Sequence, residues 1–372
     1  MSRLEFTSND RPTLGVELEL QLVDAETLGL CSCIERVLTA LPEELSSFVK
    51  PELMQCYVEL NTAVCQSVDE VHADLNLRLG ALDKIVESQG LHLLWAASHP
   101  FSSWRDQDIT VNARYDRLVG LMEDVARQLV TFGMHVHVGV DSGDKAVMIC
   151  DRMQQFLPLL LALSCNSPFW EGRNTGLRSN RSKVIEALPT AGLPYQMRNW
   201  SEYVWLVRHL EETGFINTIR EIWWDIRPHH TFGTVEIRVC DVPPNIEQVL
   251  AITALVQCLV HTISHEIDEG SYFGEYHPMM VAQNKWRAIR YGADAVLIGT
   301  RDYEPRTVPA IVEMLIERFA DVAEELNCRE HLLKLRSIPG NTGAIQQLRI
   351  LEETGSPREV VRRMIDGNRN PY

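Results

Sequence analysis

Three segments of the chain alternate apolar and polar residues with a period of two, which is the pattern of a half-buried β-strand. They are TLGVELELQLV at residues 13–23, GMHVHVGV at residues 133–140 and GTVEIRVC at residues 233–240. Shorter apolar runs predict further strands at residues 52–60, 91–97 and 222–227. We therefore expect a sheet whose strands come from widely separated parts of the chain.

Helical periodicity predicts α-helices between these strands, at residues 67–89, 111–130, 145–164 and 201–213. A long loop is expected at residues 165–198, which are rich in Gly, Pro, Asn and Arg. After Pro243 and Pro244 nearly all of residues 245–370 is predicted to be helical, apart from a loop near 292–307.

Strands interleaved with helices and followed by a helical tail favour an α+β fold built on an antiparallel sheet. We expect a single domain over residues 1–372, with a strand-rich core at about 12–242 and a mainly helical part at about 245–372. The Pro243–Pro244 step marks the change between the two parts.

Each alternating strand places a pair of polar side chains on one face, because residues i and i+2 point the same way. The pairs are Glu17 and Glu19, His135 and His137, and Glu236 and Arg238, and Glu59 ends the segment CYVEL in the same manner. One such strand could simply face water. Three strands with the same pattern indicate instead that the polar faces meet in a common site.

Neighbouring carboxylates on one strand face repel each other, and a bound cation removes that repulsion. Oxygen-rich sites suit Mg²⁺, with Mn²⁺ as the alternative, whereas sites dominated by histidine suit Zn²⁺. The sequence predicts a metal site on the concave face of the sheet, formed by Glu17, Glu19, Glu59, His137 and Glu236. Because Mg²⁺ usually shares its ligands with a phosphate, an anionic substrate is expected.

The overall charge excludes several partners. The chain has 51 Asp and Glu against 35 Lys and Arg, a formal net charge of −16, so it has no general attraction for nucleic acid or anionic lipid. No run reaches the roughly 20 apolar residues of a membrane helix. Residues 249–263 come closest, and Thr253, Gln257 and His261 interrupt them, which favours a buried core helix.

The N-terminus shows no apolar segment of a signal peptide. The nine cysteines are scattered, contain no C-x-x-C pair and sit mostly in apolar runs, which favours reduced thiols over a disulfide scaffold. We expect a cytoplasmic protein. A homodimer is compatible with the C-terminal helices.

Against this acidic background, residues 173–198 carry five basic side chains and one acid, Glu186. The basic residues are Arg173, Arg178, Arg181, Lys183 and Arg198. Arginine forks match the oxygens of phosphates and carboxylates, so this loop could bind an anion, although a solvated basic loop would look the same.

Several nucleotide and hydrolase motifs are absent. The chain has no G-x-x-x-x-G-K-[ST] loop and no G-x-G-x-x-G, so neither a P-loop nor a Rossmann site is supported. There is no G-x-S-x-G elbow and no H-E-x-x-H.

Six segments of the chain, in order, resemble the bacterial carboxylate–amine ligases called type 2 glutamate–cysteine ligases. The segments are TLGVELELQLVD, GMHVHVGV, LSCNSPFWEGRNTGLRSNRS, WWDIRP, FGTVEIRVCD and KWRAIRYGADA, and they cover roughly residues 12–300. Members often read GVEEE where this chain reads GVELE, but the altered residue, Leu18, faces away from the predicted site.

The resemblance implies a glutamine synthetase-like fold, a curved antiparallel sheet forming half a barrel with helices packed outside it. It also implies ATP and Mg²⁺ as cofactors. The implied reaction activates the γ-carboxylate of glutamate as an acyl phosphate, which an amine such as cysteine attacks to form an amide.

Residue roles follow from the same resemblance. Glu17, Glu19, Glu59, His137 and Glu236 match the positions of the metal ligands, and Arg238 that of an arginine facing phosphate or the transition state. Arg173, Arg178 and Arg181 belong to the loop that approaches nucleotide or acyl phosphate, with Arg173 also a catalytic candidate, and Arg227 is a candidate for a substrate carboxylate. His135 is either a base or a structural residue.

Two other functions stay open. A zinc-dependent amidohydrolase could use the H-x-H strand with Asp241 or a later histidine, and would retain zinc and need no ATP. A non-catalytic homologue could bind nucleotide or amino acid as a sensor. Retention of the full set of predicted ligands argues against the sensor.

Overall fold

The computed structural model describes residues 4–271 and 276–368. Its centre is a seven-stranded sheet with the order β2-β3-β1-β5-β9-β8, and β4 pairs with the remaining part of β1. The strands of the sheet are β1 (Leu14–Asp24), β2 (Val49–Pro51), β3 (Tyr57–Asn61), β4 (Leu91–Leu94), β5 (Met134–Gly139), β8 (Ile226–His229) and β9 (Thr234–Ile237). All of their pairings are antiparallel.

Helices account for most of the remaining described chain. They are α1 (Ile34–Thr39), α2 (Glu43–Ser46), α3 (Val68–Ser88), α4 (Ala113–Met122), α5 (Asp124–Arg127), α6 (Gly143–Met153), α7 (Leu157–Ser164), α8 (Asn180–Ile185), α9 (Trp200–Glu212), α10 (Ile246–Asp268), α11 (Pro278–Tyr291), α12 (Val308–Arg318), α13 (Ala320–Glu325), α14 (Arg329–Leu333), α15 (Gly343–Thr354) and α16 (Pro357–Asn368). Two small hairpins, β6 (Phe169–Trp170) with β7 (Arg173–Asn174) and β10 (Val296–Ile298) with β11 (Pro305–Thr307), complete the fold.

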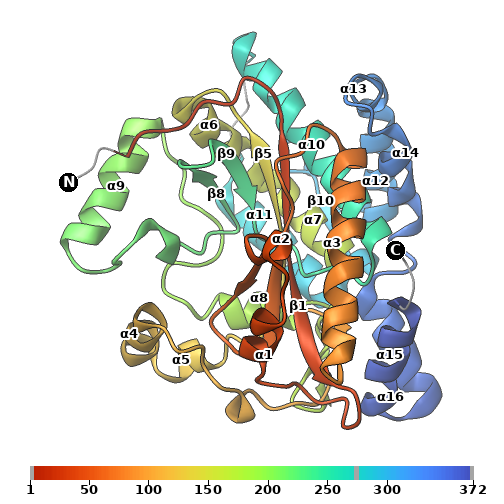
Figure 1. The fold of residues 1–372 in the computed structure, drawn as a ribbon. Helices are drawn as coiled ribbons and strands as arrows, with labels where there is room; N and C mark the ends of the chain where they lie inside the picture. Colours follow the sequence, from red (N-terminus) through yellow and green to blue (C-terminus); the bar gives the residue numbers. More distant parts are fainter. Residues whose placement is uncertain (1–3, 272–275, 369–372) are drawn as a thin grey trace.

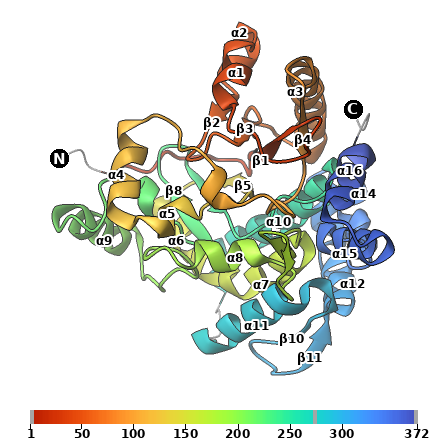
Figure 2. The same ribbon diagram turned by 90° about the horizontal axis from the view of Figure 1, so that it is seen from below.

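One face of the sheet is covered by long helices. α3 packs on β1 and β4, α10 packs on β5, and α6 packs on β8 and β9. In Figure 1, α3, α10 and the C-terminal helices lie on one side of the strands, and α4, α5 and α9 lie on the other. Figure 2 gives the view from below, in which α8 lies near the middle of the molecule. The fold is α+β, as the sequence predicted.

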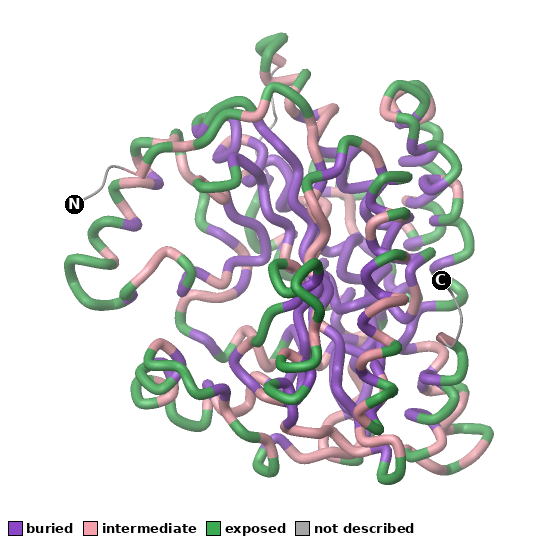
Figure 3. The backbone as a smooth tube through the Cα atoms, viewed as in Figure 1, coloured by how far each residue is buried: buried purple, intermediate pink, exposed green. Residues whose placement is uncertain are grey.

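Apolar residues at alternate strand positions fill the space between sheet and helices. Leu14, Val16 and Leu18 of β1 are buried there, in a hydrophobic cluster that also contains most of α10. The buried stretch coincides with the strands and with α10 in Figure 3. The same cluster reaches Ile338, so the strand-rich and helical parts share one core.

α10 is the apolar segment that sequence analysis assigned to the core. Asn245 caps it by accepting a hydrogen bond from the backbone N–H of Gln248. By length and composition α10 and the 143–164 segment could each span a membrane, but 83% and 78% of their most apolar windows are buried inside the protein. Burial of this extent is typical of the core helices of a globular fold, as the sequence predicted for residues 249–263.

Some predicted elements are broken at identifiable residues. The helix expected at 111–130 is interrupted at Glu123, whose φ of 48° lies in the left-handed region and separates α4 from α5. The helix expected at 145–164 is divided into α6 and α7 by a short 3₁₀ turn, and Pro158 stands in the first turn of α7, where its missing N–H costs nothing.

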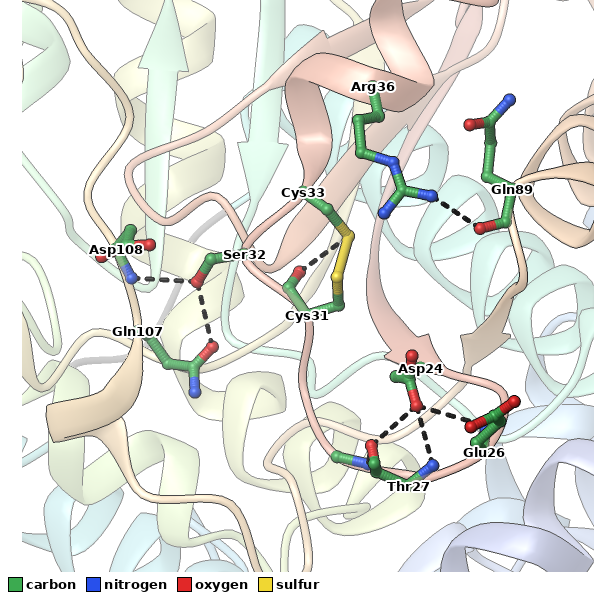
Figure 4. Close-up of a disulfide and its surroundings, with 11 residues drawn as sticks. Asp24, Glu26, Thr27, Cys31, Ser32, Cys33, Arg36, Gln89, Gln107 and Asp108 are labelled. Carbon is green, nitrogen blue, oxygen red and sulfur yellow. Dashed lines mark hydrogen bonds between the residues drawn. A yellow bond between two sulfur atoms is a disulfide. The ribbon is translucent and has the colours of Figure 1, made fainter.

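The cysteines differ from expectation at one place. Cys31 and Cys33, in the segment after β1, form a disulfide, so the prediction of reduced thiols is wrong for this pair (Figure 4). Between them Ser32 accepts a hydrogen bond from the backbone N–H of Asp108, at 3.0 Å. The other seven cysteines are free and buried, which agrees with their predicted role as small apolar residues.

Candidate active site

The strand registers bring polar side chains together on the face of the sheet that the long helices leave open. Glu17 of β1 lies opposite His135 of β5, and His137 of β5 lies opposite Glu236 of β9. Val136, between the two histidines, is fully buried on the helix side. The alternation of faces predicted from the sequence is thereby confirmed for these strands.

Three of these side chains form a group that could hold a metal ion. One ligand atom from each of Glu17, His135 and Glu236 lies within 4.8 Å of the other two. His135 Nδ1 is 2.9 Å from Glu17 Oε2. Burial and the neighbouring Arg238 lower the pKa of His135, which keeps its imidazole in the neutral form that binds metal. Two carboxylates and one imidazole fit Mg²⁺ or Mn²⁺.

The imidazole in this group is not the one that the sequence favoured. His137, the predicted ligand, adjoins the group: its Nδ1 is 2.9 Å from the hydroxyl of Thr234. Its Nε2 is buried without a hydrogen-bond partner and lies 3.5 Å from Glu17 Oε1. Both histidines therefore face Glu17, and period-two reasoning could not distinguish them because they share a strand face.

Glu17 and Glu236 are held in the ionised state by cationic or hydrogen-bonding neighbours. Burial alone would raise the pKa of Glu17, but the hydrogen bond to His135 and the adjoining imidazole of His137 outweigh it and hold that pKa well below its usual value. For Glu236 the penalty of burial is likewise exceeded, here by Arg227 and Arg238. Both carboxylates are charged before any cation binds.

A second group of carboxylates lies beside the first and has the opposite balance. Glu19 of β1 is opposite Glu59 of β3, and Glu52 lines the same cleft. Burial, together with the charges of Glu17 and Glu52, raises the pKa of Glu59 well above its usual value. Burial and the charge of Glu19 also raise the pKa of Glu52. These carboxylates lack the counter-charge that a divalent cation would supply.

Sequence analysis missed Glu52. It follows Pro51 in an irregular segment before β3, and its carboxylate accepts a hydrogen bond from Tyr115 of α4 at 3.4 Å. Strand periodicity carries no information about such a position. Only the fold, which brings this segment beside β1, places Glu52 among the other carboxylates.

The three loop arginines predicted to meet an anion lie in different places. Arg181 of α8 is buried and lines the cleft, donating hydrogen bonds to the backbone carbonyls of Arg238 and Val239. Its guanidinium lies so close to Gly133 that a Cβ at that residue would collide with it. Among the described residues, Arg173 and Arg178 are not part of the cleft lining.

Arg173 is exposed on the β6–β7 hairpin, and Arg178 pairs with Asp294 at 3.6 Å. Their positions give no support to the catalytic and nucleotide-binding roles predicted for them. Further positive charge in the cleft comes instead from residues outside the arginine-rich loop, namely Lys50, Arg114 and Arg220. Sequence analysis missed these three because they are isolated in the chain.

The two arginines of the β8–β9 pair both hold Glu236. Arg227 lies opposite Glu236, and its Nε donates to Oε2 at 2.7 Å, while another of its nitrogens donates to the carbonyl of Ile222 at 2.6 Å. Arg238 also donates to Glu236, and burial, which would lower its pKa, is outweighed by that carboxylate so that the pKa rises. Arg227, predicted to bind a substrate carboxylate, is therefore engaged by a carboxylate of the protein.

Asp241, which the hydrolase hypothesis offers as an alternative to a later histidine, has a structural role. It is fully buried, and its carboxylate accepts hydrogen bonds from the hydroxyls of Ser167 and Ser179 at 2.7 and 2.8 Å and from the backbone N–H of Asn166 at 2.9 Å. Arg181 lies 3.8 Å away. Asp241 thus fastens the 165–182 segment to the segment that follows β9 and is not part of the described cleft lining.

The carboxylates of both groups, the two histidines and three arginines, Arg181, Arg227 and Arg238, line one cleft of about 360 Å³. Carboxylates and histidines form its floor on the sheet. Its walls come from α4, α8 and the segment before β8, and include the apolar side chains Leu118, Leu129, Ile185, Leu188 and Trp223. The cleft thus combines a floor of metal-binding groups with cationic and apolar walls, and that volume accommodates a small-molecule substrate.

Known proteins with similar sequences share almost the whole chain. The family model described as "Glutamate-cysteine ligase family 2 (GCS2)" matches residues 13–367. A protein of Gloeobacter violaceus named "Putative glutamate--cysteine ligase 2" is 41% identical over 361 residues, which is 96% of this chain and 97% of that protein. A protein of Thermobifida fusca with the same name is 40% identical over 365 residues, covering 96% of this chain and 91% of its own.

Solved structures show the same fold at low identity. A glutamate–cysteine ligase from Francisella tularensis, crystallised in complex with AMP, has a TM-score of 0.70 at 14% identity and covers 98% of this chain and 90% of its own. A bifunctional glutathione synthetase from Pasteurella multocida has a TM-score of 0.68 at 13% identity, over 96% of this chain and 52% of its own. The chain belongs to glutamate–cysteine ligase family 2, a family of carboxylate–amine ligases, and shares its fold with the solved glutamate–cysteine ligase.

Proposed function

We propose that the protein is an ATP- and Mg²⁺-dependent ligase that joins the γ-carboxylate of glutamate to an amine, such as cysteine, through an acyl phosphate. The observation that supports this most strongly is the floor of the cleft. Two groups of carboxylates lie side by side there, and in one of them burial and neighbouring carboxylates raise the pKa values of Glu52 and Glu59. An ATP-dependent ligase needs divalent cations at this position.

The proposed metal ligands are the predicted set together with the two residues that the fold adds. They are Glu17, Glu19, Glu52, Glu59, His135, His137 and Glu236. When bound there, Mg²⁺ neutralises negative charge on phosphoryl oxygens and aligns them for transfer. The buried and unpartnered Nε2 of His137 and the mutual repulsion of the carboxylates are both consistent with such a cation.

The remaining residues of the cleft would position charge rather than react covalently. Phosphoryl transfer requires alignment and electrostatic stabilisation more than covalent help from the protein. Arg238 stands beside Glu236 and His135 at the floor, and Arg181 lies buried on the adjoining wall. Both guanidinium groups can stabilise charge that develops on a transferred phosphate or on the acyl oxygen.

The proposed reaction also defines the substrates. We infer small-molecule partners, glutamate and an amine, and a reaction in the cytoplasm, where ATP and Mg²⁺ are at hand. Because ligands from four strands form one continuous floor, a complete catalytic site fits better than a sensor. The hydroxyls of Ser167 and Ser179 engage Asp241, which leaves a zinc hydrolase only a later histidine to complete its site.

The direct test is a screen for ADP release. Purified protein is mixed with ATP, Mg²⁺, glutamate and a panel of amino acids and small amines, and both ADP and the amide product are measured. We expect at least one amine to give stoichiometric ADP and amide, and expect EDTA to abolish both. No amide with any amine, or turnover that persists without ATP, would refute the proposal. Glu17→Gln is the matched inactive variant.

A further inference from the structure

His229 is a polar side chain of the cleft that lies outside both carboxylate groups. His229 ends β8, two residues after Arg227, and therefore shares its face of the sheet. It lies opposite Thr234 of β9 and is part of the cleft lining. Its ring is half-buried at the end of the floor, beyond the row that contains Glu236.

A hydrogen bond to one ring nitrogen of His229 determines which of its two ring nitrogens carries the proton. The backbone N–H of Phe232 donates to Nδ1 at 3.2 Å, so Nδ1 acts as an acceptor and carries no proton. The proton must then be on Nε2, which makes that nitrogen a donor. None of the residues that the structure describes forms a hydrogen bond with Nε2 of His229, and the ring borders the open cleft.

The ring is held in place from two sides. It stacks on Phe232, with ring centroids 4.2 Å apart and an angle of 16° between the planes. It also meets the edge of His137, with centroids 5.4 Å apart. These contacts restrict rotation of the imidazole, so the direction of the Nε2–H bond is set before any ligand arrives.

The N-terminal segment fixes the turn that carries these contacts. Asn9 donates from its side chain to the carbonyls of Phe232 and Gly233, at 2.7 and 2.8 Å. Gly233 has a φ of 63°, and a Cβ there would collide with the carbonyl oxygen of Thr7. Only glycine fits at that position, and the turn is therefore anchored to a segment more than 200 residues away.

We propose that His229 is an uncharged hydrogen-bond donor that binds an anionic oxygen of the substrate through Nε2–H. Arg227, two residues earlier, was the predicted ligand for a substrate carboxylate, but its guanidinium is engaged by Glu236 and Ile222. His229 is the next donor on the same face. This inference rests on the proposed function for the identity of its ligand, a carboxylate oxygen of glutamate or a phosphate oxygen of ATP.

The test compares two substitutions at His229 with one control. His229→Phe keeps the ring and its stacking but removes the donor, whereas His229→Gln retains an N–H donor of similar reach. The control is His209→Phe on α9, an exposed histidine outside the described cleft lining. Thermal unfolding of all variants establishes that they fold, and kcat/KM is measured separately for ATP, glutamate and the amine.

We expect His229→Phe to lose about 10- to 100-fold in kcat/KM, the range for a lost hydrogen bond to a charged group. The loss should fall mainly on one substrate: on glutamate if the oxygen is a carboxylate, and on ATP if it is a phosphate. His229→Gln should recover most of the activity, and His209→Phe should match the wild type. Equal kcat/KM for His229→Phe and the wild type, within about threefold, would overturn the proposal.

A spectroscopic measurement separates this inference from the proposed function. ¹⁵N NMR of the imidazoles should show one neutral ring protonated at Nε2 whose signals disappear in His229→Phe but not in His209→Phe. Addition of glutamate or of ADP with Mg²⁺ should shift that Nε2 resonance, even if no amine in the panel is a substrate. A ring protonated at Nδ1, or no shift with either probe, would refute the donor role whatever the enzyme's activity.

Discussion

The two carboxylate groups on the floor of the cleft differ in how their charge is balanced. The paired half, Glu17 and Glu236, is surrounded by two histidines and two arginines, which lower the pKa of both carboxylates. In the unpaired half, Glu52 and Glu59 have carboxylates as their main charged neighbours, and their pKa values are raised. Without a cation, the charges of the paired half are balanced by protein side chains, whereas the carboxylates of the unpaired half repel one another.

This difference indicates what each half contributes. The paired half has a built-in geometry, because its ligands are oriented by hydrogen bonds before a metal arrives. The unpaired half supplies free energy for binding, because a divalent cation relieves its repulsion. Substitutions in the two halves should therefore have opposite effects on the stability of the metal-free protein, although both should impair turnover.

The largest effect is expected in the paired half. Glu236→Gln should reduce turnover by about 1,000-fold, since it removes a metal ligand. Glu236 is only 1% exposed and neutralises Arg227 and Arg238. Its loss should also lower the free energy of unfolding by about 3 kcal/mol, the cost of leaving buried charges unpaired.

Urea unfolding of the metal-free variant measures that loss, and ADP release measures turnover. Glu17→Gln serves as the comparison, because Glu17 is more exposed and contacts histidines rather than arginines. It should be similarly inactive but less destabilised. If Glu236→Gln were as stable as the wild type, burial of Arg227 and Arg238 would not depend on the charge of this carboxylate.

A substitution in the unpaired half should act in the opposite direction on stability. Glu59→Gln removes a buried carboxylate whose pKa is raised by burial and by neighbouring charges. We expect the metal-free protein to gain on the order of 1 kcal/mol at pH 7. Turnover should fall about 100-fold, since a metal ligand is lost. A destabilised Glu59→Gln in chelator would contradict the comparison.

The pH dependence of the free energy of unfolding should distinguish the paired half from the unpaired half without any substitution. Because the pKa of Glu59 is raised in the folded state, its protonated form is favoured, and the associated stability is lost as pH rises above the ordinary value of 4.5. Glu17 and Glu236 have lowered pKa values, so their contribution is present above 4.5 and is lost as pH falls below it. Protons also compete with Mg²⁺ for Glu59.

The increase in Tm on adding Mg²⁺ should therefore grow as pH is raised from 5 to 8, as thermal scans in buffers of matched ionic strength can measure. Magnesium-free samples that contain a chelator provide the baseline. An increase in Tm that is constant with pH, or that shrinks, would mean that no carboxylate of raised pKa takes part in binding the cation.

The smallest effects concern the arginines outside the two halves. Arg173 is exposed and remote from the described cleft lining, whereas Arg181 is buried within it. We expect Arg173→Ala to retain kcat/KM within about twofold, and Arg181→Ala to lose about tenfold. Steady-state kinetics on both variants tests this expectation. A large loss of activity in Arg173→Ala would support the catalytic role that the sequence predicted for Arg173.

Period-two alternation was sufficient to predict the strand residues on the floor of the site. It identified Glu17, Glu19, Glu59 and Glu236 because a strand face is a local property, and the antiparallel register then brought these faces together. The same reasoning could not choose between His135 and His137, since both point toward the cleft. The choice depends on how far each ring lies from Glu17 and Glu236, which only the packed strands determine.

The walls of the cleft could not be predicted in this way. Arg114 and Arg220 of the walls, like Glu52 of the floor, come from irregular or helical segments, and their approach to the sheet depends on long-range packing. The arginine-rich composition of residues 173–198 predicted that this loop approaches an anion, but composition does not reveal which of its side chains enter the cleft. Asp241 orients that loop so that Arg181 enters the cleft and Arg173 does not.

The most direct test of the account is the binding of Mn²⁺, measured by electron paramagnetic resonance of free and bound ion at neutral pH. Wild-type protein and His209→Phe should bind Mn²⁺ equally, and Glu59→Gln should bind it at least about tenfold more weakly while unfolding at a higher temperature in chelator. Unchanged Mn²⁺ affinity in Glu59→Gln, together with unchanged or lower metal-free stability, would contradict the claim that the unpaired half is a metal site.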